Sequence, residues 1–396
     1  MHRIMTILKN TIVQLLVAVV VGCLLGLVIG EALTPVVVVV KQITGQIIFF
    51  MVPLIILGFV ASSIAALQGK VGRLLLSAFG LAYASSVCAA FLAAIVGRRV
   101  IPLLTINSGM ASDAVVPEVS FSIQIPPVMS VMSALVLAIL VGLGALWLRS
   151  EAISRLLADG REMVLLMVRR VLVPILPLYI VSNFCLLSYQ GLLGQLVVFL
   201  PVIVIAIVCH YVWLAVLYTT ASLVTRKDGR QVLRHYGPAY MTAIGTMSSA
   251  ATLGVALDCA RRSPVLSRRT VDFAVPLLAN IHLCGSVLTE TFFVCVVSKL
   301  LYGALPEWST LVVFIFLFGI FAVGAPGVPG GTVLASLGIV TGVLGFDDAG
   351  TALLIAVFAL QDSFGTACNV TGDGALTLIL ERIGQSNNRE NGGSEA

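Results

Sequence analysis

Long apolar runs without any charge are the feature that most constrains this chain. The stretch 171–225 contains no Asp, Glu, Lys or Arg, and other uncharged stretches cover 42–69, 74–97, 119–148 and 308–346. A membrane-spanning helix needs about 20 predominantly apolar residues. These runs therefore predict membrane helices, and 171–225 is long enough for two, separated by a polar break at Ser188–Gly191.

The composition excludes several classes of protein. Hydrophobic residues make up 59% of the chain and charged residues only 10%, whereas a soluble domain carries roughly 25% charged residues. Such a chain cannot cover a surface in water, which argues against a soluble enzyme, a disordered protein and an ordinary nucleic-acid binder. A membrane β-barrel would show short alternating strands instead. We therefore expect an all-α polytopic membrane protein.

The apolar segments differ in how well each fits one continuous span. Spans are predicted near 11–30, 36–66, 74–97, 129–148, 162–187, 195–224, 270–300 and 347–381. Two further regions are interrupted: 235–262 contains TAIGTMSSAATLG, and 308–346 contains GAPGVPGG at 324–331. Pro and Gly at this density break a helix, and lipid cannot satisfy the exposed backbone groups. We therefore expect two re-entrant hairpins buried in protein or lining a cavity.

The distribution of Lys and Arg residues predicts how the chain is oriented in the membrane. Most Lys and Arg residues fall on one side of this topology, namely Arg3, Lys9, Lys70, Arg73, Arg149, Arg155, Arg161, Arg226, Lys227, Arg230, Arg234, Arg261, Arg262, Arg268, Arg269 and Arg382. The opposite side has mainly Arg98, Arg99 and Lys299. The positive-inside rule makes the rich side cytoplasmic, with both termini inside. The polar tail 384–396 is expected to be disordered.

Four ionisable residues in the C-terminal apolar segments are candidates for function, because such groups are costly inside a membrane. They are His282, Glu290, Asp362 and Asp373. Asp362 and Asp373 are spaced to lie near one helix face, with Asn369 on the same face. Carboxylate and amide oxygens suit small cations. The spacing of His282 and Glu290 also predicts a shared face, and a desolvated carboxyl group suits a proton carrier.

Three motifs together resemble one known family. The segments SSAATLG at 248–254, GAPGVPGG at 324–331 and DSFGTACNVTGD at 362–373 resemble the glutamate-transporter family, the dicarboxylate/amino acid:cation symporters. The segment 51–67 looks like that family's second helix, so the resemblance covers nearly the whole chain in order. It implies eight membrane helices, two re-entrant hairpins and a homotrimer. It also implies a transport domain that moves against a scaffold as an elevator.

The resemblance also implies domain boundaries. Residues 1–73 would form scaffold helices 1 and 2, and 74–98 the third helix, which belongs to the transport domain. Residues 129–190 would form scaffold helices 4 and 5. The rest of the transport domain, 191–383, would hold helix 6, hairpin one, helix 7, hairpin two and helix 8.

Functional roles carry over from the family residue by residue. Ser248 and Ser249 match the hairpin-one serines that bind the substrate carboxylate, and Gly327, Val328, Pro329 and Gly330 match the gating tip of hairpin two. Asp362 matches the aspartate that binds the substrate amine, and Gly365, Thr366 and Asn369 match positions lining the site. Asn369 and Asp373 match ligands of a sodium ion. Glu290 matches a proton-bearing glutamate, and His282 beside it could also titrate.

Two departures from the family pattern shape the expected specificity. Members that take acidic substrates carry an arginine where this chain has Gly365, and an acidic side chain without that partner would be buried unpaired. The family's NMDGT motif is HLCGS here, at 282–286, so Cys284 replaces a sodium-binding aspartate. A thiol is a poor sodium ligand. The first departure, together with the retained Asp362, predicts a neutral amino acid as substrate, and Gly365 leaves room for its side chain. The second departure puts one of the family's sodium sites in doubt and, with Glu290 matching the proton carrier, predicts coupling to protons, alone or with fewer sodium ions.

The sequence interpretation is a secondary active transporter in a bacterial cytoplasmic membrane, coupled to H⁺, Na⁺ or both, without a cofactor or nucleic-acid partner. Other possibilities are a carboxylate:cation symporter, an ion channel and, more remotely, a membrane enzyme. Several candidates also have a purely structural interpretation. Asp362 could form an ion pair with Lys41, Asn369 and Asp373 could join helices, and His282 and Glu290 could be satisfied core groups.

Overall fold

The computed structural model describes residues 11–65, 72–104, 125–191, 199–325, 327 and 329–392. Val328 lies outside this part, as do Arg3, Lys9 and Lys70. Every regular element in the described residues is a helix, which confirms the all-α class. Within the described residues, six helical segments are long and apolar enough to cross a membrane, and shorter apolar helices cover Val17–Val28, Val136–Leu148, Trp308–Gly324 and Gly331–Gly342.

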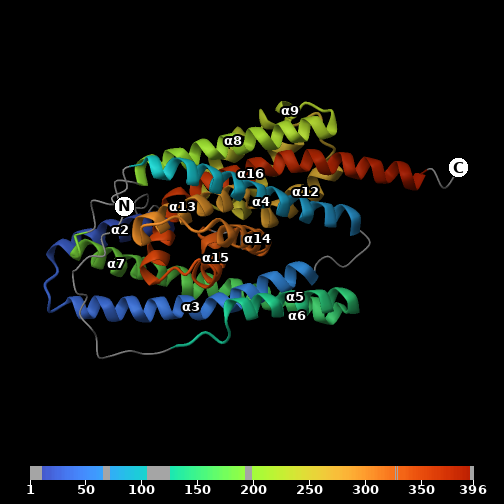
Figure 1. Cartoon of the computed structure of the whole chain (residues 1–396). Coiled ribbons are helices and arrows are strands. Elements are labelled where there is room, and N and C mark those ends of the chain that lie inside the picture. Colours follow the sequence, from blue (N-terminus) through green and yellow to red (C-terminus); the bar gives the residue numbers. More distant parts are fainter. Residues whose placement is uncertain are drawn as a thin grey trace, which may run out of the picture.

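The helices form two groups in space. The first group contains α2 (Thr11–Val28), α3 (Thr34–Ala65), α5 (Val131–Leu148), α6 (Glu151–Met167) and α7 (Val173–Tyr189). Within it, α3 packs against α5, α6 and α7, while α2 packs against α7. Figure 1 shows α3, α5, α6 and α7 together along one side of the molecule. Their exposed faces are rich in Val and Leu, as expected for helices that face lipid.

The second group contains the helices on which the candidate residues lie. It consists of α4 (Gly72–Val100), α8 (Phe199–Thr225), α9 (Arg230–Leu233), α10 (Gly237–Thr246), α11 (Ser249–Arg261), α12 (Arg268–Ile281), α13 (Cys284–Tyr302), α14 (Trp308–Gly324), α15 (Gly331–Gly342) and α16 (Asp348–Gly392). Its centre is α13, which packs against α4 and α16. Nearly every α13 side chain is buried, so helix–helix contacts surround it on all sides.

Both regions with an interrupted apolar pattern are broken helices. Between α10 and α11 the chain turns at Met247, whose φ of 48° is left-handed. Between α14 and α15 it turns through the Gly- and Pro-rich segment and restarts at Gly330, whose φ is 70°. Glycine accepts that conformation without a steric penalty. The two breaks lie where the sequence predicted the hairpin tips.

Three boundaries differ from the predicted ones. The segment predicted at 162–187 begins at Glu151, because Ser150 caps α6 and accepts a hydrogen bond from the Ile153 N–H. It continues through a π-helical turn, η2 (Val168–Leu172), into α7. The segment predicted at 270–300 is divided at His282–Leu283 into α12 and α13. The last helix continues to Gly392, beyond the predicted start of a disordered tail at 384. Gln385 Nε2 donates to Glu381 Oε1 at 2.7 Å, one turn earlier, which supports the helix past residue 384.

Candidate functional site

The tips of the two broken helices touch each other. Ser248 is the N-cap of α11, where its Oγ accepts a hydrogen bond from the Ala251 N–H at 3.2 Å. The same hydroxyl donates to the Gly327 carbonyl oxygen at 2.9 Å, which joins the two tips. Ser249, the first residue of α11, is buried beside it. The structure therefore brings together the serine motif and the glycine-rich motif, which are far apart in sequence.

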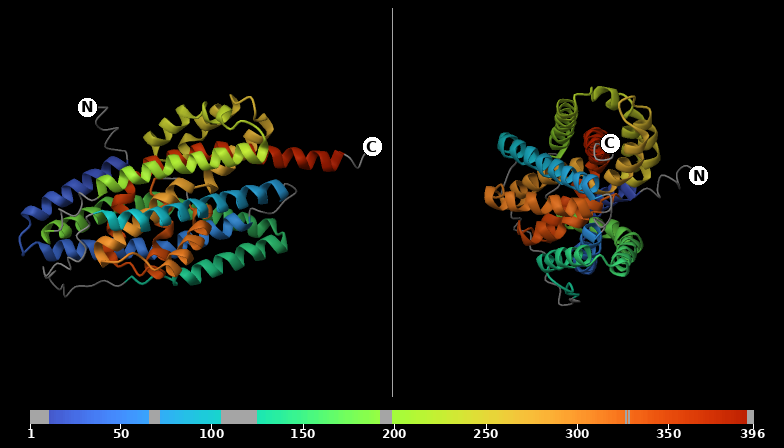
Figure 2. Two further views of the ribbon diagram at one scale, coloured as in Figure 1. Left: turned by 45° about the horizontal axis from the view of Figure 1, so that its top comes forward. Right: turned by 90° about the vertical axis from the view of Figure 1, so that its right-hand side faces the viewer.

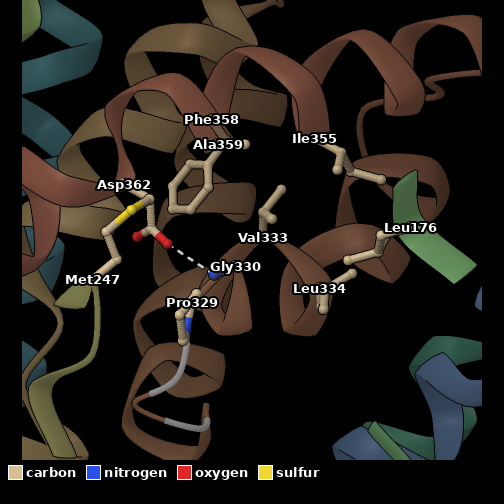
Figure 3. A pocket seen from close by; sticks show the side chains of 10 residues that line it. All are labelled: Leu176, Met247, Pro329, Gly330, Val333, Leu334, Ile355, Phe358, Ala359 and Asp362. Atoms are coloured by element: carbon tan, nitrogen blue, oxygen red, sulfur yellow. Dashed lines mark hydrogen bonds between the residues drawn. The ribbon is translucent and has the colours of Figure 1, made fainter. Parts of the chain in front are cut away.

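Asp362 on α16 holds the second tip closed. Its Oδ2 accepts a hydrogen bond from the Gly330 N–H at 2.7 Å, and the Thr366 hydroxyl lies 3.5 Å from its Oδ1. The side chain is only 4% exposed. Figure 3 shows the Asp362 carboxylate pointing at the Gly330 amide, where α15 begins. A buried carboxylate at a helix N-terminus is favourable, because the helix dipole and the N–H groups face it.

A cavity of about 20 Å³ lies beside Asp362. This volume is close to that of a single water site. Figure 3 shows Pro329 and Gly330 on one side and Phe358 and Ala359 of α16 on the other. Among the described residues that line it, Asp362 is the single charged one, and the rest are apolar. The tips are therefore closed tightly around one carboxylate in apolar surroundings.

Asn369 binds the start of α13. Its Oδ1 accepts hydrogen bonds from the Gly285 N–H at 2.7 Å and the Ser286 N–H at 3.2 Å, and its Nδ2 donates to Ser286 Oγ at 2.9 Å. An amide oxygen has two acceptor positions, and both are used here. Asp373 Oδ2, by contrast, has no hydrogen-bond partner among the described residues. The sodium site expected at Asn369 and Asp373 therefore stays a prediction, and we derive no step through a sodium ion held by this pair.

His282 links three helices inside the protein. Its Nδ1 lies 2.9 Å from Asp373 Oδ1 on α16, and its Nε2 lies 2.8 Å from Ser85 Oγ on α4. All three side chains are buried. With Asp373 ionised, Nδ1 is the donor, because a carboxylate only accepts. Ser85 was not among the predicted residues, and its one sequence signal was a hydroxyl group in an apolar helix.

Glu290 does not share a face with His282, so that expectation was wrong. His282 has an extended backbone with φ −110° and ψ 99°, and α13 begins only at Cys284, so helical spacing does not apply between them. Glu290 is fully buried and accepts a hydrogen bond from the Ser336 hydroxyl of α15. Its other oxygen has no hydrogen-bond partner among the described residues.

Gly365 is a packing residue, which corrects the expectation that it leaves room for a substrate side chain. A Cβ atom at Gly365 would lie 3.3 Å from the Ser286 Cα and 3.5 Å from the Gly285 carbonyl carbon. A Cβ atom at Gly285 would in turn meet the Gly365 carbonyl oxygen. Gly365 therefore faces the backbone of α13, and the two glycines let α13 and α16 approach closely.

The alternative pairing of Asp362 with Lys41 is also not formed. The acidic groups that act electrostatically on Lys41, on α3, are Asp348 and Asp347 at the start of α16. Tyr179 on α7 also donates a hydrogen bond to the Asp348 carbonyl oxygen at 3.3 Å. The Tyr179 hydrogen bond joins the start of α16 to the first group of helices, while the Asp362 carboxylate bonds to the second hairpin tip through Gly330.

The bridge that His282 forms between Ser85 and Asp373 leads to a prediction about the stability of the protein. We expect His282→Ala to destabilise the protein by about 3–5 kcal/mol, because it leaves the buried Asp373 carboxylate without its partner. Thermal unfolding of the purified variant in detergent measures this loss. His235→Ala is the matched control, since the His235 side chain is only partly buried and its ring accepts a hydrogen bond from the neighbouring Arg234 rather than from a buried carboxylate. Equal losses in the two variants would contradict a stabilising role for the bridge.

Comparison with known proteins gives a consistent family match. The model of the sodium:dicarboxylate symporter family matches residues 11–383. The chain is 28% identical to excitatory amino acid transporter 2 of Homo sapiens over 193 residues, which are 48% of this chain and 33% of that protein. An excitatory amino acid transporter of Caenorhabditis elegans is 29% identical over 149 residues, 38% of this chain and 29% of that protein. These matches span about a third of each relative's length.

Proposed function

The chain belongs to the sodium:dicarboxylate symporter family, and from this premise we propose that it is a secondary active transporter that couples uptake of a neutral amino acid to inward cation flow. The observation that carries the proposal is the closure of both hairpin tips around the buried Asp362 carboxylate. A substrate amine would take the place of the Gly330 N–H as hydrogen-bond donor to Asp362. Opening of the second tip would expose that position.

The roles at the tips follow from the groups available there. The start of α11, with Ser248 as its cap, offers N–H groups and a hydroxyl to the substrate carboxylate. Ser249, Pro329, Gly330 and Thr366 complete the binding region, and Val328, outside the described residues, belongs to the same tip by sequence. Asp362 pairs with the amine. The carboxylate of an amino acid would thus lie against N–H and hydroxyl donors, and its amine against the Asp362 carboxylate.

A neutral substrate is supported by the surroundings of Asp362. The described residues lining its cavity include no Lys, Arg or His that could pair with an acidic side chain. Leu176, Val333, Ile355 and Phe358 offer apolar contacts instead. Burying an additional carboxylate there would be costly. The names of the relatives support amino acids as the class, while the family name favours a carboxylate substrate as the second candidate.

The larger architecture is part of the same proposal. Eight membrane helices, with both termini in the cytoplasm of a bacterial cell, would divide into a scaffold and a transport domain at the boundaries predicted from the sequence. Among the described residues, α13 packs against α4 and α16 and makes no comparable contact with α3, α5, α6 or α7, which supports that division. Three copies would associate through the scaffold, and the transport domain would move as an elevator.

Proton coupling is assigned to Glu290, with His282 as a second titratable group. Glu290→Gln keeps the hydrogen bond from Ser336 but cannot release a proton. We expect this variant to lose uptake driven by a pH gradient alone and to keep whatever uptake a sodium gradient drives. Initial rates in proteoliposomes, acid outside, measure the difference. Unchanged pH-driven uptake in Glu290→Gln would remove Glu290 from the coupling mechanism.

The test of the function itself is uptake of labelled amino acids and C4-dicarboxylates into proteoliposomes, with an imposed sodium gradient and separately with a pH gradient. Concentrative uptake of a neutral amino acid supports the proposal. Uptake of dicarboxylates alone favours the second candidate. Electrical current that is independent of every substrate would favour an ion channel instead.

A further inference from the structure

The excess positive charge of this protein is concentrated in one short segment. Between Arg226 and Asp272 the sequence holds eight Lys or Arg residues and three Asp residues, an excess of five positive charges. The formal net charge of the whole chain is also +5. Positive and negative residues therefore balance over the rest of the chain, and this segment carries all of the net charge.

The two turns that carry most of these basic residues lie side by side. Lys227, on the turn that follows α8, donates a hydrogen bond from its Nζ to the Val265 carbonyl oxygen, on the turn between α11 and α12, at 3.0 Å. The second turn also contacts α16, where Glu381 Oε2 accepts from the Ser267 N–H at 3.1 Å. The left-hand view of Figure 2 shows α8 running alongside α16. The basic residues of both turns therefore share one surface at the end of α8.

Five arginines on this surface have no carboxylate partner. All five residues are exposed, and none forms an ion pair with a described residue. The nearby carboxylates bond elsewhere, since Asp272 pairs with Arg261 and Glu381 accepts from the Ser267 hydroxyl. We call these five residues the arginine face: Arg226, Arg230, Arg262, Arg268 and Arg269.

The arginine face is electrostatically unfavourable within the protein alone. Arg268 and Arg269 are the first two residues of α12, where the positive end of the helix dipole favours negative groups. Like charges on one surface also repel one another. A bound anion with several oxygen acceptors would relieve both effects.

An exposed apolar stripe on α8 leads directly to the arginine face. Its residues, most of them four apart on one helix face, are Leu200, Val204, Val208, Val212, Val216, Leu223 and Val224. At about 1.5 Å per residue the stripe is about 36 Å long, which covers the bilayer hydrocarbon core of about 30 Å. Arg226 follows two residues after Val224. The arginine face therefore lies at the depth of the lipid headgroups.

We propose that the arginine face binds the phosphate group of an anionic phospholipid whose acyl chains lie along α8. The planar guanidinium group matches two phosphate oxygens at once, and a basic cluster beside a membrane helix attracts anionic lipids. A soluble anion would make no use of the apolar stripe. Orientation of the chain in the membrane needs only the number of Lys and Arg residues on one side, whereas a lipid site needs them gathered on one surface.

Native mass spectrometry of the whole protein in detergent tests this proposal. The probes are dioleoylphosphatidylglycerol, which is anionic, and dioleoylphosphatidylcholine, which has the same acyl chains and phosphate but no net charge. Titration with each lipid gives a dissociation constant from the intensities of the lipid-bound species. We expect phosphatidylglycerol to bind about tenfold or more tightly, because several unpaired arginines distinguish the two headgroups.

Two variants remove one charge from each turn of the arginine face. Arg230→Gln and Arg268→Gln are each expected to raise the dissociation constant for phosphatidylglycerol about fivefold, the fold-change that corresponds to about 1 kcal/mol per arginine. Binding of phosphatidylcholine should change much less. Arg99→Gln is the matched control, because Arg99 is an exposed arginine at the end of α4 and is not part of the arginine face.

Tighter binding of phosphatidylglycerol that weakens in both variants and not in the control supports the lipid site. Equal dissociation constants for the two lipids overturn it, as does a preference for phosphatidylglycerol that persists in both variants. An equal loss in Arg99→Gln also overturns it, because total charge would then attract the lipid. Size-exclusion chromatography identifies a variant that fails to fold, and Arg269→Gln then replaces it. Binding is measured without transport, so the result does not depend on the proposed transport function.

Discussion

Replacement of Asp362 by Asn is expected to reduce amino-acid uptake by about a hundredfold. Loss of one member of a buried, hydrogen-bonded charge pair costs about 2–5 kcal/mol, and each 1.4 kcal/mol is about tenfold in affinity. The Asn side chain is the same size and its oxygen can still accept the Gly330 N–H. The hairpin contact therefore persists, and the loss reports on pairing of the Asp362 charge with a substrate amine.

Initial rates of uptake over a range of substrate concentrations measure this effect. Asp272→Asn is the matched control, because Asp272 is half-exposed and pairs with Arg261 at 2.7 Å on the surface. Exposed ion pairs contribute little, so uptake by the control should stay near wild type. Unchanged uptake by Asp362→Asn would refute the amine-binding role, and a carboxylate substrate without an amine would then become the better hypothesis.

Gly285→Ala is expected to disrupt the folded protein, because no space exists for a methyl group where α13 meets α16. A Cβ atom at Gly285 would lie 2.5 Å from the Cys368 Cβ and would also meet the Gly365 carbonyl oxygen. Neither is the flexible end of a side chain, so the two helices would have to separate. Overpacking of a core costs about 1–3 kcal/mol, and occasionally more.

Each purified variant is heated and then run on size-exclusion chromatography, and the measured quantity is the fraction of protein that remains monodisperse. Gly254→Ala on α11 is the control, because a Cβ atom there would meet open space. The same change at such a helical position stabilises a protein by about 0.4–1 kcal/mol. If both variants behave like wild type, the glycine contact between α13 and α16 does not limit stability.

The glycine contact also changes how Gly365 should be interpreted. The sequence argument placed position 365 in the substrate cavity, so that Gly365→Arg would test specificity for acidic substrates. The structure places Gly365 against the backbone of Gly285 and Ser286 instead. A side chain there would start with its Cβ atom 3.3 Å from the Ser286 Cα, so the α13 backbone would have to give by a few tenths of an ångström. The apolar lining around Asp362 is therefore a better basis for expecting a neutral substrate than the glycine at 365.

The features that could be predicted from the sequence depend on the pattern of residues within short segments. The length and apolarity of each run predict a helix, and density of Pro and Gly predicts where a helix breaks, because both properties act within a few residues. The all-α class and the two hairpin tips at 248 and 330 followed from this. The identity of the four ionisable candidates also followed, since an ionisable group in an apolar run is visible in sequence.

The partners of those groups could not be predicted in the same way. The spacing argument assumed that 270–300 is one helix, but the break at His282 turns that side chain toward Ser85 and Asp373. Asn369 and Asp373 share a face of α16, yet one caps α13 while the other binds His282. Ser336, which donates to Glu290, lies 46 residues away on another helix. Each pairing depends on how helices cross.

The sequence by itself determined that this chain forms apolar helices in a membrane, that two of them break, and which residues bring charge into the apolar interior. These properties depend on the balance between lipid, backbone hydrogen bonds and side-chain polarity along a short segment. Only the tertiary structure decided that Asp362 closes on Gly330, that His282 bridges α4 and α16, and that Gly365 is a packing residue. Contacts between segments far apart in sequence depend on helix crossings, which local periodicity does not specify.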